Sequence, residues 1–297
     1  MKPFLERLQE QRPIVGDGAL GTMLLARGLA SGQCPETWNL SRPEVLREIA
    51  AAYVEAGSEL VAANTFGASP LKLAQYGLED QTEAMNLAAV EVLRAAVGDR
   101  AYIAACCGPC GKLLKPYGDT EPQVVQDSFR KQMSLLIGAG VNVVFIETMI
   151  DLAEAVLAIK AAKDVSPGLP VVATMTFDAS PRGFFTVMGT TVEKAAVGLK
   201  AAGADVIGSN CGNGIVNMVE IARRFRKCSD LPLILQSNAG LPEVRDGRIE
   251  YPESPEFMAS KVKDLLEIGV SIIGGCCGTT PAHIRGIVQA IGAWRRS

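Results

Sequence analysis

The chain has 297 residues, of which 48% are hydrophobic, 21% are charged and only 5% are aromatic. This length exceeds that of most single domains, but the (β/α)8 barrel commonly reaches it as one domain. The formal net charge of -3 means that the chain has no excess positive charge with which to bind nucleic acid or an anionic membrane surface. No apolar run approaches the length of a membrane span. We therefore expect a small-molecule substrate, with no nucleic-acid partner and no membrane association.

The first residues, Met1-Lys2-Pro3-Phe4, carry charge where a secretory signal would need an apolar core, so we expect a cytoplasmic protein. The chain contains 8 cysteines. In a long cytosolic chain they indicate metal-binding or catalytic thiols rather than a disulfide framework. His283 is the only histidine, so a metal site would have to use sulfur or oxygen ligands.

Short apolar runs recur along the chain, and each is followed by a polar or glycine-rich turn and then by a stretch of helical period. The predicted strands are residues 14–17, 59–66, 102–107, 141–148, 171–177, 206–211, 233–238 and 271–277. Glycines such as Gly57, Gly203 and Gly269 are placed to end the helices between them. No linker or low-complexity tract divides the pattern, so it predicts an α/β fold, a single (β/α)8 TIM barrel domain over residues 1–297.

Polar side chains and cysteines stand at the carboxyl ends of these predicted strands. They are Asp17, Asn64, Cys106, Cys107, Glu147, Asp178, Cys211, Asn238, Cys276 and Cys277. In a (β/α)8 barrel the carboxyl ends of all strands form one face, and active sites are built there. An open, doubly wound sheet would not gather the ends of strands one, four, six and eight around one cavity. We therefore expect these side chains to converge.

The last predicted strand ends in Gly274-Gly275-Cys276-Cys277-Gly278. Adjacent thiols reach one ion only where the backbone turns sharply, because neighbouring side chains of a strand point to opposite faces, and glycine permits such a turn. Cys211 ends another apolar run in a similar way and can supply a third thiolate. Three sulfurs with one open position indicate a catalytic zinc site. The alternative is that these cysteines are buried as small apolar residues.

Zinc lowers the pKa of a bound thiol, so a substrate thiol in the open position would become a nucleophile at neutral pH. Asp17 and Glu147 each end an apolar strand, where an ionised carboxylate needs a partner, and a substrate ammonium is one candidate. An ion pair within the protein or a helix cap is the alternative. Backbone N–H groups in the turn around Gly18 and Ala19 could hold a carboxylate. Together these groups indicate a thiol amino acid.

A second cluster, Cys106-Cys107-Gly108-Pro109-Cys110, ends the third predicted strand. It could bind a metal or form a redox pair. No separate set of partner residues is evident, and free cysteines are often simply buried, so packing is the preferred interpretation.

These residues carry a resemblance to the homocysteine S-methyltransferase family, the barrel shared by betaine-dependent enzymes, S-methylmethionine-dependent enzymes and the N-terminal module of cobalamin-dependent methionine synthase. The matching segments are Asp17 to Thr22, Asn64 to Phe66, Gly108-Pro109, Glu147-Thr148, Met175 to Asp178, Asn210-Cys211, Asn238 to Gly240 and Gly274 to Pro281. The last segment is the most specific of them, and the resemblance covers nearly the whole chain.

The resemblance implies that Cys211, Cys276 and Cys277 bind Zn²⁺ and act in catalysis, with the homocysteine sulfur as the fourth ligand. It implies that Asp17 and Glu147 hold the α-amino group and that backbone around Gly18 and Ala19 takes the carboxylate. Asn238 is a further candidate for substrate binding. The implied reaction is methyl transfer to the homocysteine thiolate, which gives methionine.

The segments Asn238 to Pro242 and Gly278 to Thr280 resemble the methionine synthase module more than the other two branches, and the chain ends without folate, cobalamin or reactivation modules. We therefore expect a methyl group from methylcobalamin on a separate corrinoid protein. Betaine or S-methylmethionine as donor is the alternative. A hypothesis of another class is a non-catalytic barrel that senses zinc or thiols, although the paired carboxylates favour substrate binding.

Overall fold

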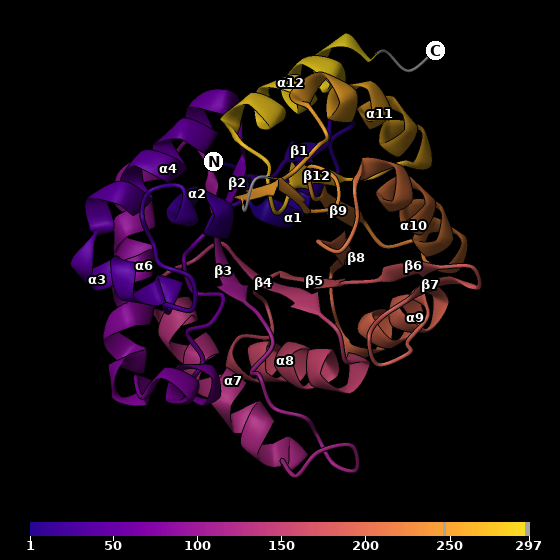
Figure 1. The fold of residues 1–297 in the computed structure, drawn as a ribbon. Coiled ribbons are helices and arrows are strands. Elements are labelled where there is room, and N and C mark those ends of the chain that lie inside the picture. The colour runs from indigo at the N-terminus through magenta and orange to yellow at the C-terminus, as the bar shows by residue number, and fades with distance from the viewer. Residues whose placement is uncertain (246–247, 295–297) are drawn as a thin grey trace.

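The computed structural model describes residues 1–245 and 248–294 of the chain. Eight strands form one sheet in the order β1-β12-β9-β8-β5-β4-β3-β2, and neighbouring strands in this order are parallel. A bridge between Gly16 and Leu60 joins the two outer strands, so the sheet closes on itself. Figure 1 shows this closed sheet surrounded by helices. The predicted single-domain TIM barrel is confirmed.

The barrel strands are short, as expected for segments buried between a lumen and a layer of helices. They are β1 (Ile14–Val15), β2 (Leu60–Ala62), β3 (Tyr102–Cys107), β4 (Val143–Met149), β5 (Val171–Met175), β8 (Val206–Asn210), β9 (Leu233–Ser237) and β12 (Ile272–Gly275). The predicted run 59–66 was too long, because regular pairing of β2 stops at Ala62. Strand β3 has the predicted bounds.

Helices alternate with the strands and form the outer ring (Figure 1). The longer ones are α4 (Pro43–Ala56), α6 (Thr82–Val97), α7 (Pro122–Gly138), α8 (Leu152–Val165), α9 (Val192–Ala202), α10 (Ile215–Cys228), α11 (Pro255–Ile268) and α12 (Pro281–Ala293); the shorter ones are α1 (Phe4–Leu8), α2 (Gly21–Leu25), α3 (Trp38–Ser41) and α5 (Pro70–Leu73). Gly57, Gly203 and Gly269 end α4, α9 and α11 in the left-handed conformation, as predicted.

Two hairpins were not predicted. They are β6 (Asp178–Ser180) with β7 (Gly183–Phe185), and β10 (Glu243–Arg245) with β11 (Arg248–Glu250). Figure 1 shows the first hairpin reaching outward beyond the ring of helices near α9. Both are short and lie outside the barrel sheet, so the apolar periodicity that identifies barrel strands does not find them.

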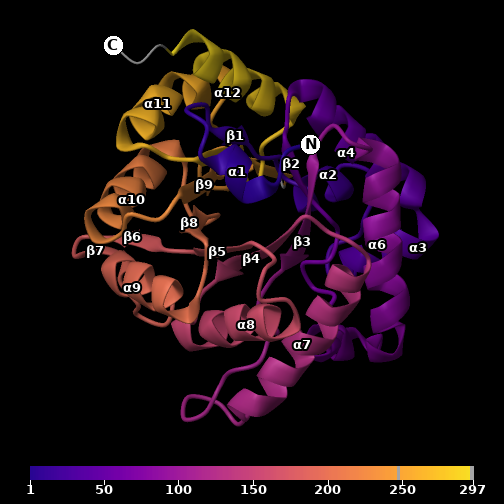
Figure 2. The same cartoon turned by 180° about the vertical axis from the view of Figure 1, so that it is seen from behind.

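The lumen of the barrel is apolar at its N-terminal end. Side chains from all eight barrel strands form one buried cluster, which includes Ile14, Leu60, Phe145, Val206 and Ile272. Phe4 of α1 joins this cluster, and Figure 2 shows α1 lying across that end of the barrel. Because apolar side chains fill the lower lumen, only its opposite, carboxyl end is left for polar groups. Within the described residues, no helix is long and apolar enough to cross a membrane.

A substitution in β8 tests the close packing of the barrel. A Cβ added at Gly208 would collide with the carbonyl oxygen of Ile234 on the neighbouring strand. We expect Gly208→Ala to lower the free energy of unfolding by about 1–3 kcal/mol, the usual cost of overpacking. Gly138→Ala is the matched control, because its added Cβ meets nothing within 4 Å and Ala favours the helix. Urea unfolding of both variants is the measurement, and equal stability of the two would contradict this packing.

A candidate metal and substrate site

Three cysteine thiols meet at the carboxyl end of the barrel. Cys211 directly follows β8, and Cys276 and Cys277 directly follow β12. The Sγ atoms of Cys211 and Cys277 are 3.9 Å apart, and all three sulfurs lie within 4.8 Å of one another. Each of the three residues is half-buried. The two segments, separated by more than sixty residues in the sequence, therefore bring their thiols to one point that is still open on one side.

The backbone leaves the strand conformation where these thiols stand. Cys211 has φ 59° and Gly212 has φ 73°, so the chain turns through the left-handed region directly after β8. Gly278, with φ 80°, directly follows Cys276 and Cys277. A non-glycine residue in the left-handed region is strained and is frequent at functional sites. Thr148, with φ 58°, is the other such residue in the described part of the chain, and it directly follows Glu147. The turn that we predicted for the adjacent cysteines is present.

The thiol arrangement fits a zinc ion. Tetrahedral zinc with sulfur at about 2.3 Å requires sulfurs that are roughly 3.8 Å apart. The Cys211 to Cys277 separation of 3.9 Å matches that requirement. Three soft sulfur donors with an open side also match the ligand set of a site that keeps one position for a substrate. Cys211, Cys276 and Cys277 would be the ligands.

The three thiols share protons. Hydrogen bonds from Cys276 and Cys277 lower the pKa of the Cys211 thiol, and the proximity of Cys211 raises that of the other two. A cluster that already favours one thiolate is prepared for a cation, because metal binding replaces the shared protons.

Glu147, in β4, lies beside this cluster and is held by two side chains from other strands. Cys106 Sγ, in β3, donates to Glu147 Oε1 at 2.5 Å. Asn210 Nδ2, in β8, donates to Glu147 Oε2 at 3.0 Å and lies 3.8 Å from Cys276 Sγ. Asn210 thus connects the carboxylate to a thiol of the triad. Burial raises the pKa of Glu147 to about 7.

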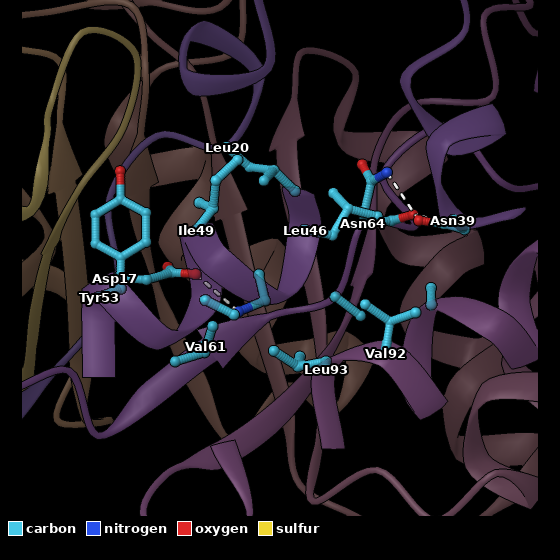
Figure 3. Close-up of a pocket in the computed structure, with 14 residues that line it drawn as sticks. Asp17, Leu20, Asn39, Leu46, Ile49, Tyr53, Val61, Asn64, Val92 and Leu93 are labelled. Carbon is cyan, nitrogen blue, oxygen red and sulfur yellow. Dashed lines mark hydrogen bonds between the residues drawn. The ribbon is translucent and has the colours of Figure 1, made fainter. Parts of the chain in front are cut away.

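Asp17, just beyond β1, is buried at 8% exposure. Its Oδ2 accepts a hydrogen bond from the Ala62 N–H at 2.8 Å, as Figure 3 shows. Burial, together with the nearby charge of Glu147, raises the pKa of Asp17 to about 8. Within residues 1–245 and 248–294, no Lys or Arg is among the groups that shift the pKa of Asp17 or Glu147. An ion pair with a basic residue of this part of the chain therefore does not explain the two carboxyls. Two carboxylates without a cation suit a cationic ligand.

Asp17 also borders a small cavity between α4, α6 and β2 (Figure 3). The cavity has a volume of about 30 Å³. It can hold roughly one or two water molecules, far too little for an amino-acid substrate. The substrate site must therefore be sought at the open side of the thiol cluster and not in this cavity.

The turn after Asp17 is tied to the cysteine turn. The Ala19 N–H donates to Thr279 Oγ1 at 3.0 Å, and Thr279 Oγ1 donates to the Cys276 carbonyl at 2.7 Å. The Tyr53 hydroxyl lies 2.7 Å from the Ala19 carbonyl and 3.2 Å from that of Thr279. The Ala19 N–H, which we expected to be available to a substrate carboxylate, is thus already engaged, and a carboxylate there would have to displace Thr279. The Gly18 contact stays a prediction.

Asn238, beyond β9, is 4% exposed, and its N–H donates to the Asn213 carbonyl at 2.9 Å. Its side-chain oxygen Oδ1 is buried and has no hydrogen-bond partner in the described part of the chain. A buried acceptor without a donor is costly unless a ligand supplies one. This observation supports Asn238 as a ligand contact, although its role remains a prediction.

Other predicted strand-end residues lie elsewhere. Asn64 donates to Asn39 Oδ1 at 2.9 Å beside the small cavity, and Asp178 is exposed in the hairpin. Cys107 Sγ lies 3.2 Å from Gln132 Oε1 in the helix layer, and the Cys110 N–H donates to Glu154 Oε1 at 2.7 Å. Cys107 and Cys110 pack in the core, as preferred, but Cys106 contacts Glu147.

The sequence interpretation did not single out Asn210, Thr279 or Tyr53 as site residues. Asn210 directly precedes a predicted thiolate ligand, and Thr279 lies two residues after another. That proximity, and their place in the matching segments Asn210-Cys211 and Gly274 to Pro281, are the sequence signals for them. Tyr53 carries none, because it lies in α4, where an apolar periodic position predicts only core packing.

Comparison with known proteins gives one family. The model of the family described as homocysteine S-methyltransferase matches residues 14–291. The chain is 32% identical over 305 residues to the methionine synthase of Mycobacterium tuberculosis (strain ATCC 25618 / H37Rv), which covers 96% of this chain and 25% of that protein. The methionine synthase of Mycobacterium leprae (strain TN) is also 32% identical, over 95% of this chain and 24% of that protein. The chain thus spans about a quarter of the length of these relatives.

Among solved structures, the metallated form of the homocysteine methyltransferase MmuM from Escherichia coli aligns with a TM-score of 0.78. The alignment covers 96% of this chain and 99% of that one at 21% identity. The oxidized form of the same protein aligns with a TM-score of 0.77 at 22% identity. At this level of identity the likeness establishes the shared barrel fold.

The raised pKa of Asp17 predicts how stability depends on pH. The folded carboxyl titrates at about 8, whereas an unfolded one titrates at about 4. Its contribution to the free energy of unfolding is therefore full below about pH 4 and is lost as the pH rises through 8. We expect Asp17→Asn to flatten the decline in stability between pH 5 and 8, which one such group can steepen by up to about 1.4 kcal/mol per pH unit.

The measurement is urea unfolding of wild type and Asp17→Asn across that pH range, without an amino-acid ligand. Some slope should remain, because Glu147 also has a raised pKa. A variant with the full wild-type slope would show that Asp17 is ionised in the folded chain.

Proposed function

The chain belongs to the homocysteine S-methyltransferase family, and we propose that it transfers a methyl group to the sulfur of homocysteine to give methionine. The observation that carries this proposal is the position of the Cys211, Cys276 and Cys277 thiols beside a half-buried carboxylate, Glu147. The three thiols could hold a metal ion that binds the substrate thiol, and the Glu147 carboxylate could bind the substrate ammonium. We infer that residues 1–297 act as one catalytic domain.

When bound, zinc would act as a Lewis acid that keeps a substrate thiol in its open position deprotonated at neutral pH. The chain's own residues would position the rest of the amino acid. Glu147 and Asp17 would accept hydrogen bonds from the α-ammonium, whose positive charge would lower the pKa of both carboxyls and keep them ionised. Asn238 Oδ1, a buried acceptor with no partner among the described residues, would take a further donor of the substrate. The turn around Gly18 would face its carboxylate.

Asn210 would hold the carboxylate that binds the ammonium at a fixed distance from the thiol cluster. Its Oδ1 accepts from the Thr148 N–H at 2.8 Å and from Thr174 Oγ1 at 2.7 Å, which fixes the orientation of the amide. Its Nδ2 then points to Glu147 and toward Cys276. A fixed separation between the ammonium and thiol sites selects the chain length of the amino acid, and such positioning is a large part of catalysis.

For the methyl donor, we propose methylcobalamin carried by a separate corrinoid protein. Two observations support this donor. The segments Asn238 to Pro242 and Gly278 to Thr280 resemble the methionine synthase module, and the chain is 32% identical to methionine synthases over most of its length. Betaine and S-methylmethionine are the competing donors. The eight cysteines are free, which suits a reducing, cytoplasmic setting.

The first experiment measures metal content by elemental analysis of protein purified under reducing conditions without added zinc. Homocysteine is then supplied with methylcobalamin, betaine or S-methylmethionine in parallel. One zinc per chain, with methionine formed and cobalamin demethylated, is the expected result. Turnover with betaine or S-methylmethionine but not with methylcobalamin would contradict the proposed donor. Zinc without turnover from any donor would favour a non-catalytic sensor.

Removal of one thiol provides a direct prediction. Cys276→Ala leaves two of three sulfur ligands, so we expect zinc content far below one per chain and methionine formation reduced by at least about 100-fold. Cys228→Ala is the matched control, because Cys228 is exposed at the end of α10. It should retain both zinc and activity. Full activity of Cys276→Ala would remove the thiol triad from the mechanism.

A further inference from the structure

Cys106 is a thiol that the proposed chemistry does not use, although it contacts a residue that the chemistry needs. It lies in β3 at 3% exposure, and its Sγ is 2.5 Å from Glu147 Oε1. It is not part of the thiol triad found among the described residues. A metal-ligand role is therefore not suggested, and its contact with the carboxylate needs another explanation.

The side-chain alternation of β3 directs Cys106 into the barrel. Tyr102 and Ala104 belong to the cluster inside the lumen, whereas Ala105 and Cys107 pack in the outer core. Cys106 is on the lumen side because side chains of a strand alternate between its two faces. Glu147 follows Val143 and Phe145 on the same side of the neighbouring strand. The contact between the two side chains is thus built into the strand pairing.

The thiol of Cys106 is a neutral donor. Burial raises its pKa well above the usual value for a thiol, and the charges of Glu147 and Asp17 raise it further. A protonated thiol can donate one hydrogen bond. Its acceptor here is one oxygen of Glu147, while Asn210 Nδ2 donates to the other oxygen at 3.0 Å. Glu147 is therefore held from two opposite sides, by β3 and by β8.

We propose that Cys106 is a positioning residue for the substrate ammonium, because it fixes the carboxylate of Glu147 in the orientation that receives the amino group. The proposal rests on the proposed function. A carboxylate offers about four lone-pair sites, so each oxygen keeps an acceptor site after one donor has bound it. With both oxygens held, the remaining sites have fixed directions, and less conformational freedom is lost when the ammonium binds. Without Cys106, Oε1 loses the one hydrogen-bond donor that it has among the described residues.

The experiment compares binding of two ligands by zinc-loaded protein, using calorimetry. One ligand is homocysteine, and the other is 4-mercaptobutanoic acid, which has the same thiol and carboxylate but no amino group. Cys106→Ala should weaken homocysteine binding about tenfold, the effect of one lost hydrogen bond to a charged group. It should change binding of the des-amino ligand by less than about twofold, because that ligand has no ammonium for Glu147 to hold.

Two further variants separate positioning from packing. Cys106→Ser keeps a donor at the same place and should restore homocysteine binding to within about threefold of wild type. Cys107→Ala removes the adjacent thiol, which faces Gln132 in the helix layer, and should leave the ratio of the two affinities unchanged. In turnover, Cys106→Ala should raise the KM for homocysteine with little change in kcat, as expected for a loss of binding rather than of chemistry.

Equal weakening of both ligands in Cys106→Ala would overturn the proposal, because it would show a general structural effect. Unchanged homocysteine binding in Cys106→Ala would overturn it too. Both results leave the proposed function intact, provided that wild type binds homocysteine and forms methionine. If wild type binds neither ligand, the proposed function fails, and the role of Cys106 fails with it.

Discussion

The Thr279 hydroxyl links the two turns from which the site is built. It accepts from the Ala19 N–H and donates to the Cys276 carbonyl, so it joins the loop after β1 to the loop after β12. Only glycine fits at positions 18 and 275, because neighbouring side chains occupy the space that a Cβ would need. A Cβ at Gly18 would lie 2.7 Å from Thr279 Oγ1, and one at Gly275 would also collide with Thr279. The turn that carries Asp17 and the turn that carries Cys276 and Cys277 are therefore held together by the same Thr279 side chain.

The second constraint is electrostatic. Asp17, Glu147 and the three thiols bring potential negative charge to one end of the barrel, and no Lys or Arg appears among the groups that shift the pKa of Asp17 or Glu147 in the described residues. Burial disfavours the charged form of both carboxyls and raises their pKa values, so they bind protons more readily than exposed carboxyls do. A cationic metal and a substrate ammonium would each replace such protons. The same residues therefore favour both parts of a zwitterionic thiol complex.

The sequence predicted the barrel and the thiol triad because both depend on local patterns. Apolar runs between glycine-ended helices mark the strands, and cysteines at strand ends mark the face where they meet. It could not predict the contacts of Asn210 or Tyr53, because these join side chains to residues more than thirty positions apart. The Asn210 contact depends on how strands β4 and β8 face each other in the closed barrel, and the Tyr53 contact depends on how α4 packs on it. The hairpin β6–β7 was missed for a related reason, since its residues are exposed or half-buried and carry no core pattern.

Two pairs of adjacent cysteines in this chain show why backbone conformation decides what a thiol can do. Cys106 and Cys107 both lie within β3, so one faces the lumen and Glu147 while the other faces the helix layer and Gln132. Cys276 and Cys277 lie beyond the end of β12, where the turn brings both sulfurs to Cys211. The dipeptide is the same in both places. The glycines before and after the second pair release it from the alternation of the strand, and only there can neighbouring thiols share one ion.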